Sequence, residues 1–520
     1  MDNENTGLHL LKKGQSGIRQ LIFGRMGIVV VLLILQILIL IALFVRFEEY
    51  YIHYFGGTAI LAVFMVLHLQ NRQIDAATRT TWLIIVLAAP VFGSILYCFT
   101  RFEIGQGLLK RRVNNVRVQT KEILTQDEAV LHTLRQTDPG AASMCSFAAK
   151  VSDAVVYQNT EVTYFPTGEK KLERLLLELE KAEKFIYLEY FIISEGVMWG
   201  QILDVLVRKA AQGVDVRVIY DGTCEFILLP KGYAEKLRKL NIDCKVFSPF
   251  TPFVSTHYNF RDHRKILVID GHTAFNGGIN LSDEYINIGS RHGHWKDTAV
   301  MLKGEAALGF TLMFLQMWNL DVRQQDYTPP VLSSVTPSHG YVMPFGDSPM
   351  DNSRTGQRIY MDLINRARKQ VCIMTPYLII DEEMENCLCY AAARGVCVQL
   401  LLPGIPDKIV PYALAKTHYR VLLEAGVEVF EYSPGFDHAK VLVVDGTEAV
   451  IGTINFDYRS FYHHFECGTY LYGCACIADM QKDFAQCVQI SRRVTFESIR
   501  NEKWYLKLLG FLLKGFEPLL

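Results

Sequence analysis

Two short segments of the chain repeat the same chemically active side chains. The segment DHRKILVIDG contains His263 and Lys265, and DHAKVLVVDG contains His438 and Lys440 at the same spacing. In an extended strand, side chains two positions apart point to the same face. Each segment therefore predicts a histidine and a lysine that share one face at the entrance of a buried, apolar strand.

An aspartate and an asparagine follow at matching positions in both copies. Asp270 and Asp445 each lie seven residues after their histidine, and Asn280 and Asn455 end the elements GGIN and GTIN. An offset of seven turns a strand side chain to the opposite face, so we interpret the two aspartates as structural residues that fix the following glycine turn. The asparagines are expected to enter on a neighbouring strand, which brings a His, a Lys and an Asn together in each copy.

These side chains are suited to a reaction at a phosphodiester. A neutral imidazole can attack phosphorus and form a phosphohistidine, while a protonated imidazole can give its proton to the departing alcohol oxygen. Histidine titrates near neutrality, so one residue type can fill both roles. The two lysines and two asparagines would place positive charge and hydrogen-bond donors around the non-bridging oxygens. The pattern requires no metal and no other cofactor, and it leaves open which histidine is the nucleophile.

A single HxK pair before an apolar strand is more often a solvated strand end than a catalytic site. Here the pair occurs twice at identical spacing, and each copy is followed by the same Asp-Gly and Asn elements. The repetition favours a catalytic site that both copies build together.

The elements around the two copies also repeat. The helical pattern KKLERLLLELEKAEK precedes the apolar strand FIYLEYFII, and a further helix precedes VDVRVIYDG. Later in the chain, NRARKQVCIMTPYLII and AAARGVCVQLLLPG repeat these two steps. Helices that alternate with buried strands are typical of an α/β sheet. We therefore predict an α/β fold in which two duplicated domains pack face to face.

The N-terminal part of the chain differs in kind. It contains three apolar runs, residues 27–45, 54–69 and 82–99, and the first is nearly free of charge and about long enough to cross a bilayer as a helix. The third has Trp82 and Tyr97 near its ends, as in an aromatic belt. We therefore predict N-terminal transmembrane helices, two or three in number, and a multi-pass protein of the cell membrane.

Composition limits which partners and which cellular compartment we expect for the protein. Lys and Arg total 53 against 54 acidic residues, so there is no global basic field and we expect no nucleic-acid partner. The twelve cysteines form no CxxC pair, and Cys372 and Cys397 lie in apolar runs that resemble buried strands. We interpret them as reduced core thiols, which favours a catalytic part on the cytosolic face. The number of spans, protein partners and the oligomeric state stay open.

The C-terminal segment KWYLKLLGFLLKGFEPLL is amphipathic. Its Trp504, Tyr505 and Lys507 suit a helix that lies on a bilayer surface. A helix that packs on the second domain explains the pattern equally well.

The motifs resemble those of the phospholipase D superfamily, whose HxKxxxxD signature occurs twice in one chain or once in each subunit of a homodimer. Within it the chain is similar to the bacterial cardiolipin synthases, from about residue 50 to the C-terminus. The resemblance is carried by WLIIVLAAPVFGSILY, IYLEYFII, GVDVRVIYDG, NFRDHRKILVIDG, GGINLSDEY, GHWKDTAV, MTPYLIID, FDHAKVLVVDG and GTINFDYRSFYHHFE.

The resemblance implies an organisation of the whole chain. We expect a membrane anchor at 1–102, a linker at 103–150, a first phospholipase D-like domain at 151–325, a linker at 326–355, and a second phospholipase D-like domain with the amphipathic segment at 356–520. The signature carries Asp270 and Asp445 into the catalytic set beside the His and Lys pairs.

The resemblance also implies the reaction and the residue roles. One phosphatidylglycerol molecule would transfer its phosphatidyl group to another, which gives cardiolipin and releases glycerol. His263 would be the nucleophile, and His438 would be the general acid and later the base. The family pattern places an orienting carboxylate behind each histidine. In the second half Glu466 fits; in the first half the same offset lands on Arg291, so Asp297 is the expected residue.

Other functions fit part of the pattern. Attack of water on the same intermediate would make a phospholipase D hydrolase, and another acceptor alcohol would make a different phosphatidyltransferase. A nuclease would need a more basic cleft and no spans. A non-catalytic membrane scaffold is disfavoured because both His and Lys pairs are intact.

Overall fold

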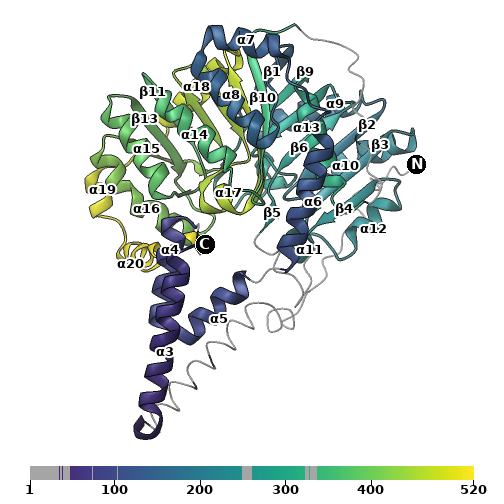
Figure 1. Cartoon of the computed structure of the whole chain (residues 1–520). Coiled ribbons are helices and arrows are strands. Elements are labelled where there is room, and N and C mark those ends of the chain that lie inside the picture. The colour runs from purple at the N-terminus through teal and green to yellow at the C-terminus, as the bar shows by residue number, and fades with distance from the viewer. Residues whose placement is uncertain are drawn as a thin grey trace.

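A computed structural model of the chain describes residues 34, 38, 47–72, 74–101, 104–248, 260–322, 327 and 337–519. The first apolar run, 27–45, therefore lies outside the described residues except for Ile34 and Leu38. Within the described part, two large sheets with flanking helices form the body of the molecule (Figure 1).

The first sheet has the strand order β1-β9-β7-β6-β2-β3-β4. Its strands are β1 (Thr160–Phe165), β2 (Phe185–Tyr190), β3 (Asp215–Asp221), β4 (Asp243–Phe247), β6 (Lys265–Ile269), β7 (Thr273–Gly277) and β9 (Ala299–Gly304). β2, β3 and β4 run parallel, and the other neighbours pair antiparallel. The parallel part follows from the helices inserted between those strands, because a parallel pair needs a crossover connection.

The second sheet repeats this order as β10-β19-β17-β16-β11-β13-β14, with β20 added at its edge. Its strands are β10 (Tyr341–Asp347), β11 (Gln370–Met374), β13 (Cys397–Pro403), β14 (Glu428–Tyr432), β16 (Val441–Val444), β17 (Glu448–Gly452), β19 (His464–Tyr472) and β20 (Arg492–Arg493). The predicted duplication of an α/β domain is confirmed, position by position, by the two matching strand orders.

Alternating side chains on the central strands build three cores. Leu267 of β6 lies in the core of the first half, and Leu442 of β16 lies in the core of the second half. Their neighbours Ile266 and Val441 point to the opposite faces and meet in a third cluster that both halves share. The strands are therefore apolar on both faces. One face packs against helices of the same half, and the other contributes to the shared cluster between the halves.

Helices flank the two sheets, and two of them, α13 and α18, contribute side chains to the shared cluster. The first half has α9 (Gly168–Leu179), α10 (Val197–Ala211), α11 (Thr223–Ile227), α12 (Tyr233–Arg238), η3 (Asp283–Ile286) and α13 (Ala307–Trp318); the second has α14 (Thr355–Arg366), α15 (Glu382–Ala393), α16 (Ile409–Glu424), α17 (Tyr458–Tyr462), α18 (Cys476–Gln489), α19 (Phe496–Arg500), α20 (Trp504–Lys514) and η4 (Glu517–Leu519). Side chains of Thr167 and Asp381 cap α9 and α15 by accepting backbone N–H groups, which explains where both helices begin.

The segment 103–150, which we expected to be a linker, is largely helical. It forms α6 (Ile104–Thr120), α7 (Glu128–Thr137) and α8 (Pro139–Ser152). Leu134 and Ala142 are fully buried in the core of the second half. The polar composition did not indicate buried helices, because each of these helices buries only one face and exposes the rest.

The N-terminal helices also differ from the prediction. They are α3 (Phe47–Gln70), α4 (Ala76–Ala88) and α5 (Pro90–Arg101), so the run 82–99 is divided between two helices. Pro90 begins α5, and a proline disfavours helical geometry at the residue before it. No helix among the described residues is both long and apolar enough to span a bilayer. The predicted spans at 54–69 and 82–99 are therefore not supported.

The cysteines are all unpaired thiols, and most of them are buried. Cys372 lies in the shared cluster, as expected, but Cys397 is exposed at the first position of β13. An exposed strand entrance explains this difference, because only the following residues pass under the helices.

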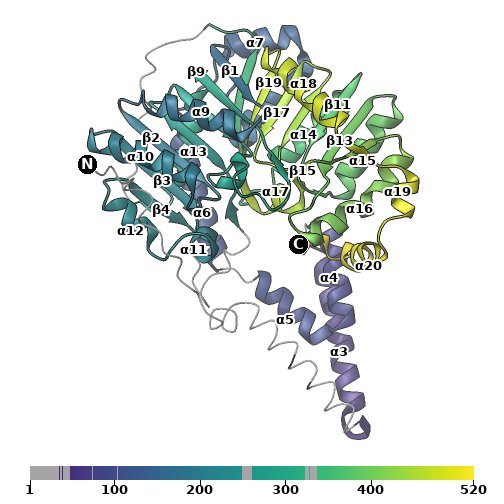
Figure 2. The same cartoon turned by 180° about the vertical axis from the view of Figure 1, so that it is seen from behind.

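Three short pairings add to the strand orders of the large sheets. β5 (Arg261–Asp262) pairs with β19, and β15 (Gly435–Asp437) pairs with β8 (His294–Lys296), so both pairs join the two halves. β12 (Leu378–Ile379) pairs with β18 (Phe456–Asp457) inside the second half. The first two pairs lead directly into the repeated His-Lys motifs. From behind, β15 lies near the junction of the two halves (Figure 2).

Candidate active site

Each motif histidine is held in place by a strand of the opposite half. The backbone N–H of His263 donates to the carbonyl of Phe465 at 2.9 Å, and that of His438 donates to the carbonyl of Lys296 at 2.7 Å. Both contacts continue the parallel pairs β5·β19 and β15·β8. The two imidazoles are thus brought to the junction of the halves by symmetric backbone contacts.

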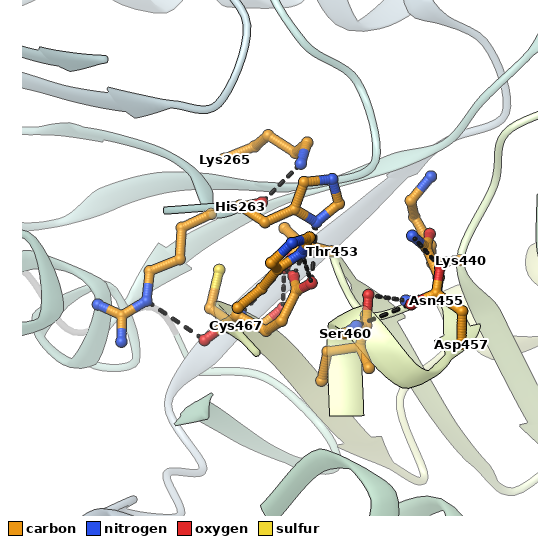
Figure 3. Close-up of polar contacts among 12 residues, drawn as sticks. His263, Lys265, Lys440, Thr453, Asn455, Asp457, Ser460 and Cys467 are labelled. Carbon is orange, nitrogen blue, oxygen red and sulfur yellow. Dashed lines mark hydrogen bonds and ion pairs between the residues drawn. The ribbon is translucent and has the colours of Figure 1, made fainter. Parts of the chain in front are cut away.

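His263 is oriented by Glu466. Its Nδ1 lies 2.9 and 3.0 Å from the two carboxylate oxygens of Glu466, which is fully buried. A carboxylate only accepts hydrogen bonds, so Nδ1 carries the ring proton and Nε2 keeps its lone pair. The hydroxyl of Thr453 donates to the same carboxylate (Figure 3). This arrangement leaves Nε2 of His263 available as a base or a nucleophile, with its ring oriented by an anion.

The pKa values of this pair follow from burial and mutual attraction. Burial of the imidazole lowers the pKa of His263 to about 3, against the attraction of Glu466. Burial of the carboxylate acts to raise the pKa of Glu466, but His263 outweighs it and the pKa lies well below the usual range. His263 is therefore neutral and Glu466 is ionised at neutral pH.

His438 is oriented by Asp297. Its Nδ1 lies 2.6 Å from Oδ2 of Asp297 and 2.9 Å from Nζ of Lys440. Burial of the imidazole is the main cause that lowers the pKa of His438 well below its ordinary value, and repulsion by Lys440 is the second. Burial also raises the pKa of Asp297 to about 7, against the attraction of Lys440. The second imidazole thus lies between a carboxylate and a cation, unlike the first.

Gly278 makes room for the Asp297 carboxylate. A Cβ added at this glycine would lie 2.2 Å from Oδ1 of Asp297, so the carboxylate would have to move. The same oxygen accepts the backbone N–H of Thr298 at 2.7 Å. The GGIN element therefore contributes an open space to the site in addition to Asn280.

The assignment of the two carboxylates by sequence was wrong in one respect. We expected Glu466 to serve the histidine of the second half and Asp297 that of the first. The structure crosses the pairs, since Glu466 contacts His263 and Asp297 contacts His438. The physical reason is the exchange of β5 and β15 across the junction, which sequence spacing does not reveal.

The two lysines of the motifs are buried with the histidines. Nζ of Lys265 donates to the carbonyl of His263 at 2.5 Å, and Nζ of Lys440 donates to that of His438. Burial lowers the pKa of Lys265 to about 7 and that of Lys440 to about 8, against nearby carboxylates. An anionic phosphate group would favour their charged forms.

The two asparagines follow β7 and β17 rather than lying in a strand. Asn280 accepts the backbone N–H of Ile192 at 3.1 Å and donates to the hydroxyl of Tyr285 at 2.6 Å. Asn455 donates to Asp457 at 3.2 Å, while its buried Oδ1 has no hydrogen-bond partner (Figure 3). Both are buried near the motifs, and a role in binding phosphate stays a prediction.

The two motif aspartates lie at the far end of their strands. Asp270 accepts three backbone N–H groups, from residues 183 to 185, at 2.7 to 2.8 Å. Asp445 accepts those of residues 368 to 370 at 2.7 to 2.9 Å. Both have positive φ, at 51° and 52°, and each ties its turn to the entrance of the neighbouring strand. The geometry is that of a structural residue.

Some side chains at the site were not predicted. His464 lies with its ring centroid 5.3 Å from that of His263. Lys171 is fully buried and donates to the carbonyl of Ile279 at 3.2 Å, beside Asn280. His464 could have been found from the sequence, because it lies two residues before Glu466. Lys171 lies on a helix far from the motifs, and nothing in the sequence indicated its place at the site.

Two imidazoles on crossed carboxylates, with a lysine beside each, on a duplicated α/β fold define a two-motif site of the phospholipase D type. The family described as "Cardiolipin synthase, PLD-like domain" matches residues 175–318 and 360–488. The chain belongs to this family of phosphatidyltransferase enzymes.

Individual relatives agree with this assignment. A cardiolipin synthase from Alkalihalophilus pseudofirmus is 32% identical over 89% of this chain and 92% of its own length, and one from Geobacillus kaustophilus matches equally. An uncharacterized protein from Streptococcus mutans is 49% identical over 88% of this chain and 99% of its own length. The crystal structure of a phosphatidylserine synthase from Haemophilus influenzae has a TM-score of 0.52 at 16% identity, covers 68% of this chain and 92% of that one, and supports the fold alone.

Proposed function

We propose that the protein is a cardiolipin synthase that transfers a phosphatidyl group from one phosphatidylglycerol molecule to another and releases glycerol. The observation that carries this proposal is the crossed pairing of His263 with Glu466 and of His438 with Asp297. It engages Nδ1 of both rings and leaves both Nε2 atoms for a phosphodiester between the halves.

In the first step, Nε2 of His263 attacks the phosphorus of phosphatidylglycerol. The new N–P bond forms as the bond from phosphorus to the glycerol oxygen breaks, and His438 gives a proton to that oxygen. His438 must be protonated for this step, and the negative charge of the bound phosphodiester favours that state. Lys265 and Lys440 stabilise the charge on the non-bridging oxygens.

In the second step, neutral His438 accepts the proton of a glycerol hydroxyl on a second phosphatidylglycerol. That oxygen attacks phosphorus, the N–P bond breaks, and His263 regains its lone pair. The product is cardiolipin, and both histidines return to their starting states. The choice of His263 as the nucleophile rests on the family resemblance.

We also propose that the enzyme works at a membrane surface. On α3, Ile60 is 74% and Phe64 is 63% exposed; on α20, Trp504 is 74% and Phe511 is 79% exposed. In both views α3 extends away from the body and α20 lies beside α4 (Figures 1 and 2). Exposed apolar faces of this kind are typical of helices that insert into a lipid interface. The run 27–45 and the cytosolic placement stay sequence-based predictions.

Packing of α20 on the second half is confirmed, and its exposed face supports the proposal that it also contacts a bilayer. Leu506 and Gly510 are buried, and a Cβ at Gly510 would meet the carbonyl of Ala413 on α16 at 2.8 Å. The opposite face carries the exposed Trp504 and Phe511. One face thus packs on the second half while the other is free for lipid.

Lipid contact of α20 can be tested with vesicles that contain brominated phosphatidylglycerol. Quenching of wild-type fluorescence should exceed that of Trp504→Phe, because Trp504 would lie among the brominated chains. Phe511→Ser should weaken this difference, and Leu177→Ser, which changes an exposed apolar residue of α9, should not. Equal quenching with and without Trp504 would contradict the contact.

The reaction can be tested in vesicles that contain labelled phosphatidylglycerol. Wild-type protein should form cardiolipin and glycerol in equal amounts, and both His263→Ala and His438→Ala should be inactive. In the second variant, rapid quenching should trap the label on His263, because the first step can proceed slowly without its acid. Release of phosphatidic acid without cardiolipin would establish a hydrolase instead. Label trapped on His438 in the His263→Ala variant would reverse the roles of the two histidines.

A further inference from the structure

The unpredicted His464 has an unused ring nitrogen at the active site. The residue is only 8% exposed, and its Nδ1 has no hydrogen-bond partner. That nitrogen lies 3.6 Å from Oε1 of Glu466, which is too long for a hydrogen bond. A buried imidazole nitrogen without a hydrogen bond is costly unless it binds something in a functional state.

His263, His464 and Glu466 together form a set of metal-ligating groups. One donor atom from each residue lies within 4.8 Å of the donor atoms of the other two. The Nδ1 of His263 and that of His464 lie 2.9 and 3.6 Å from the same oxygen of Glu466. In a tetrahedral zinc site, Zn–N and Zn–O bonds near 2.0 to 2.2 Å place ligand atoms about 3.3 Å apart. The two nitrogen-to-Glu466 distances are therefore within a few tenths of an ångström of that value, and the two imidazole donors lie within 4.8 Å of each other.

In the part of the chain that the structure describes, the other half of the active site offers no such set. Phe465 and Lys296 accept the backbone N–H groups of the two motif histidines, so the preceding residues, His464 and Trp295, occupy equivalent positions. Trp295 packs on His438 with a ring-centroid distance of 5.4 Å and has no lone pair for a metal. Among the described residues, the group around His263 is the one cluster of this kind.

We propose that His263, His464 and Glu466 form an inhibitory binding site for a transition-metal dication such as Zn²⁺. Two imidazoles and one carboxylate are ligands that zinc prefers, whereas Mg²⁺ and Ca²⁺ favour sets made of oxygen atoms. The carboxylate also supplies negative charge inside a buried site. A water molecule or a substrate oxygen would complete the tetrahedron.

Metal binding at this place blocks the nucleophile through its tautomer. When Nδ1 of His263 binds the ion, the single proton of the neutral ring must move to Nε2. Nε2 then lacks the lone pair that would attack phosphorus, and Glu466 no longer orients the ring. This consequence rests on the proposed role of His263, while binding of the metal does not.

Binding can be measured on the full-length protein in detergent without chelators. Calorimetry should show one tight Zn²⁺ site in the wild type, and His464→Asn should weaken it by at least about tenfold, in line with the loss of one ligand. Co²⁺ in the same site should give a tetrahedral visible spectrum without thiolate charge transfer, which separates the site from the free cysteines. His463→Asn changes the neighbouring histidine, which is not in the cluster, and should keep the affinity. No binding, or equal binding by His464→Asn, would overturn the site.

Inhibition is measured separately as cardiolipin formation. Zn²⁺ should inhibit the wild type and EDTA should restore it, whereas Mg²⁺ should have no such effect. The His464→Asn variant should need at least about tenfold more Zn²⁺ for half inhibition of its own activity. Tight binding without inhibition would contradict the role of His263 in the proposed function and leave the metal site standing.

Discussion

The carboxylate of Glu466, from the second half of the chain, lies 2.9 and 3.0 Å from Nδ1 of His263 in the first half. The reverse contact joins Asp297 of the first half to His438 of the second, at 2.6 Å. Each half therefore supplies an imidazole to its own motif and the orienting carboxylate to the other. Neither half contains both a motif histidine and the carboxylate that contacts it.

We expect Glu466→Gln to lower kcat by about 10³-fold, with a smaller change in KM. The amide can still hydrogen-bond the ring but carries no charge, so it no longer holds His263 in the tautomer with a free Nε2. Steady-state kinetics on phosphatidylglycerol vesicles measures both constants. An unchanged melting temperature serves as the control for folding, and a variant with normal kcat would rule out the orienting role.

Gly278→Ala should displace the carboxylate of Asp297, because the new Cβ would lie 2.2 Å from its Oδ1. A misplacement of about 1 Å at a catalytic group can cost about 10²-fold in rate, and we expect a loss of that size in kcat. The matched control is Gly200→Ala in α10, where nothing lies within 4 Å of the added Cβ. It should retain activity and gain about 0.5 to 1 kcal/mol in free energy of unfolding.

Asp270→Ala tests whether the motif aspartates are structural. The change removes the acceptor of three backbone N–H groups, one of them partly buried and two exposed, so we expect a loss of about 1 to 2 kcal/mol in the free energy of unfolding. Denaturant unfolding followed by circular dichroism measures this loss. Well below its melting temperature the folded variant should keep most of its kcat; full stability with the inactivity of His263→Ala would instead indicate a catalytic carboxylate.

His418 should make stability depend on pH. Its Nδ1 lies 2.5 Å from Glu385 and its Nε2 lies 3.4 Å from Glu517. Burial opposes protonation and Lys514 repels it, but the two carboxylates prevail and raise the pKa of His418 above 6.5. The hydrogen bond from His418 lowers the pKa of Glu385 below 4.5.

The sign follows from these two shifts. A raised histidine pKa contributes stability below 6.5 that is lost as the pH rises through the folded value. The lowered pKa of Glu385 contributes stability above 4.5 that is lost as the pH falls. His418→Gln should therefore lower the free energy of unfolding most between pH 4.5 and pH 6.5, by about 2 kcal/mol. The loss should become progressively smaller above neutrality. Thermal melting from pH 4.5 to pH 9 checks this; a pH-independent difference would contradict it.

Much of the fold was predictable because its signals are local. The helix before β2 and the strand FIYLEYFII follow from their hydrophobic periods, and the repeated motifs required two similar sheets. Helices α6 to α8 were missed because their small apolar faces become visible only against the core that they cover. The run 82–99 was read as one span, although Pro90 divides it.

By itself, the sequence determined the chemistry that is available: His263 and Lys265, His438 and Lys440, and a duplicated α/β frame to carry them. The tertiary structure alone decided which carboxylate orients which histidine and brought His464 beside His263. The reason is physical. Spacing along a strand fixes the face of a side chain, whereas contacts between halves depend on how β5 and β15 cross the junction, which no local pattern encodes.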